Sequence, residues 1–146
     1  MKKEEIIPNT IYYTNNLSTI TQVIDKIDEV KNTDMDKMEL IKLLGIYTIN
    51  KCGIVLVSFK EDKENINGGM IISRRKDKWG QYLFIDLAWI DPHCPNLRRK
   101  FQEEIILACK TRGIKRVQAV MKRGFKAMHK LYGFKEINRT LETEVS

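Results

Sequence analysis

The chain has 146 residues, with 26 Lys and Arg against 19 Asp and Glu and a net charge of +7. This length suits a single domain over residues 1–146, and no run of about 18 apolar residues suggests a membrane span. No apolar segment follows the basic start, so no signal peptide is predicted. Three cysteines without a CxxC pair favour a reducing compartment, and we therefore expect a cytoplasmic protein.

The first third of the chain predicts a short strand and two helices. Residues 10–13 favour β-structure, and Ser18 is the expected N-cap of the first helix. The second helix is expected to begin at Thr33 or Asp34. Apolar residues repeat at helical spacing in both segments: Ile20, Val23, Ile24, Ile27 and Val30 in the first, and Met38, Ile41, Leu44 and Tyr47 in the second.

Three strands in succession are predicted next. Residues 53–60 are rich in β-branched side chains, and residues 61–69 are polar and end in two glycines, which is typical of a loop. Residues 70–75 form the next strand, and residues 76–80 turn into a strand over 81–90. That last strand is apolar on both faces except for Asp86, as expected for a central strand covered on both sides.

The C-terminal part predicts a helix, a strand, a short helix and a final strand. The first helix begins near Asn96 and ends at Gly113 as its C-cap. The strands cover residues 116–121 and 136–145, and the short helix between them ends in Tyr132-Gly133-Phe134. This order predicts an α/β fold with a mixed, mostly antiparallel central sheet and helices on both faces.

Positive charge is concentrated near the C-terminus. Residues 92–146 hold 13 of the 26 basic residues but only 5 of the 19 acidic ones, a net charge of +8, while residues 1–91 carry −1. The phosphates of a cofactor or of nucleic acid would suit this half, and a solvated basic face without a ligand is the alternative.

The spacing from Pro92 through Ala108 to Gly113, together with the closing Gly133-Phe134, resembles the GNAT superfamily of N-acetyltransferases. The resemblance covers roughly the last two-thirds of the chain. It implies a GNAT-like fold, acetyl-CoA as the co-substrate and transfer of an acyl group to an amine. The small size and altered cofactor turn are similar to divergent members encoded by phages and mobile elements.

The same resemblance implies where acetyl-CoA binds. In the family it enters a gap between two parallel strands, so its pantetheine is expected along the backbone of Ala88, Trp89 and Ile90. Its pyrophosphate is expected at the start of the following helix. The family has Gln/Arg-x-x-Gly-x-Gly/Ala there, whereas this sequence has Pro95, Asn96, Leu97, Arg98, Arg99 and Lys100.

Without glycine the backbone approaches a phosphate less closely, so the side chains of the basic triplet Arg98, Arg99 and Lys100 are expected to bind it instead. The alternative is that these residues form the solvent face of an amphipathic helix.

Three residues are candidates for the chemistry. Asp86 would act as general base toward the amine, directly or through water, with a pKa raised by burial; alternatively it is a buried Asp satisfied by a Lys or Arg partner. By resemblance, His129 occupies the position of the family's tyrosine that protonates the departing thiolate. The alternatives are a surface histidine and proton donation by Tyr132.

The two histidines and the scattered cysteines lack metal-ligand spacing, so no metal site is predicted.

Two functions follow from these patterns. The first is an acyl-CoA-dependent N-acetyltransferase acting on an unidentified amine. The second is a non-catalytic module of the same fold that binds nucleic acid or a protein partner through its basic half. The sequence leaves the oligomeric state open.

Four aromatic residues are expected to line the core or a cleft rather than to stack on bases: Trp79, Tyr82, Phe84 and Trp89.

Overall fold

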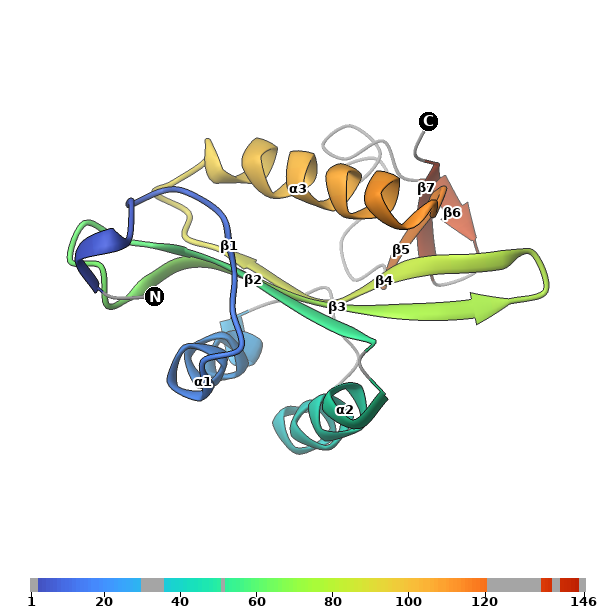
Figure 1. Ribbon diagram of the computed structural model, residues 1–146, viewed down its shortest axis with the longest axis horizontal. Coiled ribbons are helices and arrows are strands. Elements are labelled where there is room, and N and C mark those ends of the chain that lie inside the picture. The colour runs from blue at the N-terminus through green and yellow to red at the C-terminus, as the bar shows by residue number, and fades with distance from the viewer. Residues whose placement is uncertain (1–2, 30–35, 51, 121–134, 138–139, 145–146) are drawn as a thin grey trace.

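The computed structural model describes residues 3–29, 36–50, 52–120, 135–137 and 140–144, which form a seven-stranded sheet with helices on both faces (Figure 1). The strand order is β1-β2-β3-β4-β5-β7-β6, and β4 and β5 are parallel while every other neighbouring pair is antiparallel. The predicted α/β class with a mixed, mostly antiparallel sheet is confirmed. The strands are β1 (Tyr12–Tyr13), β2 (Gly53–Phe59), β3 (Ile66–Asp77), β4 (Gly80–Ile90), β5 (Arg116–Val120), β6 (Lys135–Ile137) and β7 (Thr140–Glu144).

The helices lie in two layers, one on each side of the sheet (Figure 1). The helix α3 (Leu97–Arg112) covers one face, and α1 (Leu17–Asp25) and α2 (Lys37–Asn50) cover the other. The sheet therefore separates two hydrophobic clusters, of which the α3 cluster contains Phe101 and the α1/α2 cluster contains Val23, both fully buried. Two short 3-10 helices, η1 (Lys3–Glu5) and η2 (Lys26–Glu29), complete the described elements, and none of the described helices is long and apolar enough to cross a bilayer.

The helix α1 begins earlier than predicted because Asn16, not Ser18, is its N-cap. Asn16 has an extended backbone, and its side-chain oxygen accepts a hydrogen bond from the Thr19 amide at 3.0 Å. Ser18 lies inside the first turn. After Asp25 the helix continues as the 3-10 helix η2, in which Ile27 is still buried. Val30 lies outside the described residues.

The inward face of α2 differs from the prediction. Met38 and Ile41 are exposed at 61% and 45%, whereas Leu40 is fully buried and Leu43 and Leu44 are partly buried. Apolar residues lie on both faces of α2, so either face could pack against the sheet, and in the structure the face that carries Leu40 does so. The predicted start at Thr33 or Asp34 and the Tyr47 side chain lie outside the described residues.

The predicted loop over residues 61–69 is too long, because β3 already begins at Ile66. A Cβ built on Gly68 would lie 2.5 Å from the Phe101 ring, and one on Gly69 would lie 2.8 Å from the Val23 side chain. These glycines let α3 and α1 approach opposite faces of the strand closely, so they mark contacts rather than a turn.

The predicted strand over 136–145 is two strands. Residues Ile137 and Thr140 pair across a two-residue connection, so β6 and β7 form an antiparallel hairpin, and β7 also pairs with β5. By contrast, the predicted left-handed C-cap at Gly113 is confirmed, with φ of 66° and its amide bonded back into the last turn of α3.

Candidate functional site

The parallel ladder between β4 and β5 is short among the described residues. The ladder between β4 and β5 stops at the pair Ile85 and Ala119, although β4 continues to Ile90. On its other side, β4 stays paired with β3 from Leu87 to Ile90. The edge of β4 that follows Ile85 on the β5 side therefore has no ladder partner among the described residues, and the backbone of Ala88, Trp89 and Ile90 lies along this edge.

A β-bulge at Asp86 lies directly after the last pair of the parallel ladder. Ile72 pairs with Ile85 and Ile71 with Leu87, which leaves Asp86 as the extra residue of β4. The bulge reverses the alternation of the strand, because Ile85 packs in the α3 cluster and Leu87 in the α1/α2 cluster. Such bulges increase the local twist of a strand and disrupt its pairing.

The Asp86 side chain is fully buried and forms an ion pair with Arg75 of β3, with 2.7 Å between the guanidinium and the carboxylate. Arg75 also donates to the Ser73 hydroxyl at 3.0 Å and lies 4.0 Å above the centre of the Phe84 ring. The structure thus supplies the basic partner considered for a buried Asp86, and the role as general base stays a prediction.

The turn between β4 and α3 uses its own carbonyl groups to satisfy the first amides of the helix. The Leu97 amide donates to the Cys94 carbonyl at 3.1 Å and the Arg98 amide to that of Pro95 at 3.4 Å, while Asn96 makes no side-chain cap. Leu97 is only 2% exposed, and its side chain belongs to the α3 cluster. A phosphate at this helix start would therefore depend mainly on side chains, as the missing glycines suggested.

The basic triplet is not equally available for a ligand. The Lys100 ammonium donates to the Asn9 carbonyl at 2.5 Å, and Arg99 pairs with Glu103 at 3.2 Å. The Arg98 side chain has no hydrogen bond or ion pair with any described residue and is half-buried. Arg98 is therefore the member of the triplet that a phosphate would engage without breaking an existing contact.

A buried contact joins the N-terminal segment to this turn. The Asn67 side chain is almost fully buried; its amide group donates to the Asn9 side chain at 2.7 Å and lies 3.8 Å from the Cys94 sulfur. The Asp91 amide donates to the Asn67 carbonyl at 2.9 Å. We call Asn9, Asn67, Cys94 and Lys100 the amide joint. Sequence analysis missed it, because it placed Asn67 in a loop and no local pattern links residues so far apart.

The remaining predicted residues have different outcomes. His129 and Tyr132 lie outside the described residues. Among the described residues, no group of three or more His, Cys, Asp or Glu side chains is arranged to hold a metal ion. Trp89 and Phe84 are buried and Tyr82 is half-buried, as expected, whereas the Trp79 side chain is 72% exposed and belongs to neither hydrophobic cluster. It lies in the turn between β3 and β4, beyond the reach of either cluster.

Comparison with solved structures identifies the fold. The chain is similar to a GNAT-family acetyltransferase from Staphylococcus aureus, with a TM-score of 0.69, 18% identity, and coverage of 94% of this chain and 99% of that one. It is also similar to a predicted acetyltransferase from Clostridium acetobutylicum solved with acetyl-CoA, with a TM-score of 0.66, 16% identity and coverage of 88% and 92%.

A third similar structure is a GNAT-family N-acetyltransferase from Escherichia coli in complex with CoA, with a TM-score of 0.66, 11% identity and coverage of 93% of this chain and 81% of that one. No protein-family model and no curated protein matches the sequence. At these identities the likeness shows that the chain has the GNAT fold.

Proposed function

We propose that the protein is an N-acetyltransferase that transfers an acetyl group directly from acetyl-CoA to an amine. The edge of β4 beyond Ile85 carries this proposal, because it has no ladder partner among the described residues and offers its backbone groups next to the end of the parallel ladder. Support comes from the Clostridium and Escherichia structures of the same fold, which contain acetyl-CoA and CoA. A cytoplasmic location agrees with three free cysteines.

In this proposal the pantetheine of acetyl-CoA lies along Ala88, Trp89 and Ile90, where its amides take the place of a missing strand. The pyrophosphate lies at the start of α3, where the positive end of the helix dipole faces it. Arg98 supplies the main side-chain contact, because Arg99 and Lys100 already have partners.

The chemistry is a displacement at the thioester carbonyl. The amine nitrogen attacks the carbonyl carbon, the bond from carbon to sulfur breaks, and an amide and CoA thiolate result. Asp86 or a water molecule accepts the proton lost by the amine, and His129 or Tyr132 protonates the thiolate.

Calorimetry with acetyl-CoA tests the binding step. We expect Arg98→Ala to weaken acetyl-CoA binding by about 10- to 150-fold, because a hydrogen bond to a charged group contributes about 1.5–3 kcal/mol. Arg99→Ala is the matched control. It removes the same charge from the neighbouring residue, whose side chain already pairs with Glu103, and should have a much smaller effect on acetyl-CoA binding.

Absence of binding by the wild-type protein at millimolar acetyl-CoA would contradict the proposal. Turnover is followed separately as release of CoA thiol in the presence of a panel of amines. Binding without CoA release for any amine would favour the non-catalytic module instead.

A further inference from the structure

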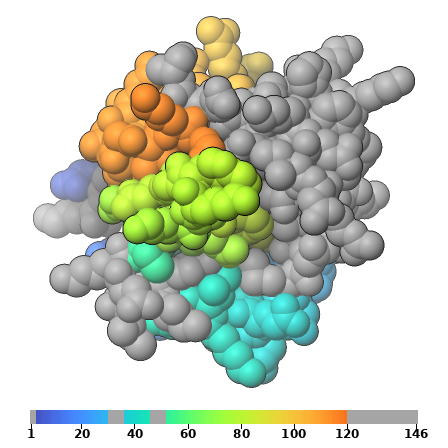
Figure 2. Space-filling view, turned by 90° about the vertical axis from the view of Figure 1, so that its right-hand side faces the viewer, coloured from blue at the N-terminus to red at the C-terminus, as the bar shows by residue number. Residues whose placement is uncertain are grey.

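The turn between β3 and β4 presents an exposed tryptophan among basic residues. Trp79 is 72% exposed, and the Lys78 ammonium lies 4.4 Å from the centre of its ring. Figure 2 shows the hairpin (green) projecting toward the viewer, directly below the end of α3 (orange). One face of the indole therefore carries a cation, while most of the ring remains accessible to a ligand.

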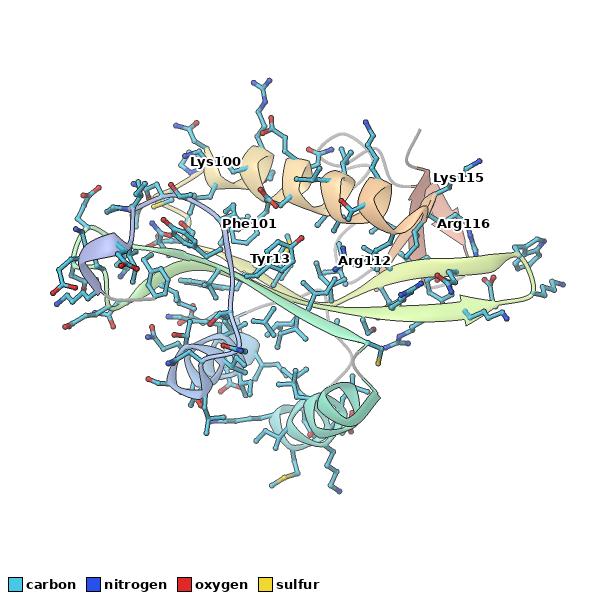
Figure 3. The ribbon with its side chains drawn as sticks, viewed as in Figure 1. Tyr13, Lys100, Phe101, Arg112, Lys115 and Arg116 are labelled. Carbon is cyan, nitrogen blue, oxygen red and sulfur yellow. The ribbon has the colours of Figure 1, made fainter. Side chains whose placement is uncertain are left out.

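A pocket of about 510 Å³ lies between this turn and the C-terminal end of α3. Its walls come from Trp79, Gly80 and Gln81 of the hairpin and from Gly113, Lys115 and Arg116 of the segment that leads into β5. Gly80 and Gly113 have positive φ angles of 112° and 66°, which favour glycine over other residues. Figure 3 shows Arg112, Lys115 and Arg116 gathered at this end of the helix.

The polar groups of this pocket are mainly donors. Asp77 is already occupied by Arg116, whose guanidinium donates to it at 3.0 Å and to the Gly80 carbonyl at 2.9 Å; the same hydrogen bonding holds the pKa of Asp77 below its usual value. The Gln81 side-chain oxygen accepts two N–H groups of Arg74, which leaves the Gln81 amide hydrogens for a ligand.

The lysines around the pocket have no acidic partner within the described part of the chain. Lys76, Lys78 and Lys115 form no ion pair with a described residue. An accessible indole beside exposed ammonium groups suits a ligand that is both aromatic and anionic.

We propose that this surface, formed by Trp79, Lys78 and Lys115, binds a nucleotide whose base stacks on Trp79 and whose phosphate contacts Lys115. The site is distinct from the proposed acetyl-CoA site, because α3 has 16 residues and its two ends are therefore about 24 Å apart. The nucleotide is either free or part of a single strand, since both present the same base and phosphate.

Fluorescence anisotropy with a labelled oligothymidylate tests the site in the full-length protein without acetyl-CoA. Trp79→Ala should weaken binding about 5- to 150-fold, because stacking on one base contributes about 1–3 kcal/mol. Lys115→Ala should weaken binding and flatten the slope of log affinity against log salt by about 0.7, the value for one phosphate contact of a single strand.

Two substitutions far from the pocket serve as matched controls. Tyr13→Ala removes another exposed aromatic side chain, 53% accessible on β1, and Lys42→Ala removes an exposed charge on α2. Neither should change the affinity by more than about 2-fold, since surface substitutions away from a contact have small effects.

Unlabelled thymidine monophosphate distinguishes the two sources. Full competition by the mononucleotide at its own micromolar affinity identifies a free nucleotide, and retained oligonucleotide binding identifies a single strand. The proposal is overturned if the wild type binds neither probe, or if Trp79→Ala loses no more affinity than Tyr13→Ala. It is likewise overturned if Trp79→Ala weakens acetyl-CoA binding as strongly as nucleotide binding, since the nucleotide would then belong to the CoA site.

Discussion

Gly68 sits in β3 directly beneath the Phe101 ring of α3, where a side chain has no room. Gly68→Ala would place a Cβ 2.5 Å from this fully buried ring. We expect the substitution to lower the free energy of unfolding by about 1–3 kcal/mol, the usual cost of overpacking a core. Urea denaturation followed by circular dichroism measures this change.

Gly45→Ala provides the matched control for this prediction. Gly45 lies within α2, and a Cβ built there meets no atom within 4 Å. The same substitution should therefore raise the free energy of unfolding by about 0.5–1 kcal/mol, because alanine favours a helix interior over glycine. If both substitutions change the free energy of unfolding by the same amount, the close approach of Phe101 is not the reason for glycine at position 68.

At the scale of elements, the amide joint connects the N-terminal segment, β3 and the turn before α3. Asn9 lies in the left-handed region with φ of 62°, and its amide donates to the Phe59 carbonyl at 3.0 Å. In Figure 3, Lys100 lies near the N-terminal end of α3, where it reaches the Asn9 carbonyl at 2.5 Å. These contacts hold the turn that the proposed function uses for the pyrophosphate.

Loosening this joint should weaken acetyl-CoA binding without touching the ligand. Asn9→Gly keeps the left-handed backbone and the carbonyl that Lys100 binds, but removes the side chain that accepts from Asn67. We expect a loss of acetyl-CoA affinity of about 2- to 10-fold in calorimetry, the range for a neutral hydrogen bond of 0.5–1.5 kcal/mol. Asn67→Ala should lose at least as much.

Ser58→Ala is the control for a buried polar group that does not touch the turn. Ser58 is fully buried on β2 and pairs in register with Gly68, and its hydroxyl has no hydrogen-bond partner among the described residues. It should leave acetyl-CoA affinity unchanged. If Asn9→Gly and Asn67→Ala also bind acetyl-CoA as the wild type does, the joint is structural only.

Across the whole molecule, the proposed reaction needs two parts of the chain at one thioester. The edge of β4 beyond Ile85 binds the pantetheine, and residues 121–134 supply the proton donor. His129, four residues before Gly133, is the proposed acid for the thiolate. His129→Ala should lower kcat by about 100-fold or more, and His129→Tyr should restore part of it, because a positioned acid commonly contributes this much. The kcat is measured by CoA release, with acetyl-CoA affinity determined separately.

Tyr132→Phe tests the competing donor in the same assay. Full kcat in His129→Ala together with a loss in Tyr132→Phe would transfer the role to Tyr132. Full kcat in both variants would mean that the thiolate leaves without either acid.

Local patterns predicted most of the elements correctly. Continuous apolar character identified β4 as a central strand, and Gly113 marked the end of α3. The chain order of these elements was enough to predict a mixed sheet with helices on both faces. Such features depend on residues close together in the sequence, where side-chain period and glycine conformation act directly.

Tertiary structure decided which partner each predicted element meets. The sequence showed that Asp86 stands alone in an apolar strand, but the hairpin register and the bulge placed Arg75 against it. It predicted Met38 and Ile41 on the inward face of α2, but packing on the sheet buried Leu40 instead. The amide joint brings Asn9 to Asn67 and to Lys100 across long stretches of chain. The periodicity of apolar residues predicts that one face of a helix or strand is buried. Only the folded chain decides which segment covers that face, because the covering residues lie far away in the sequence and leave no local pattern.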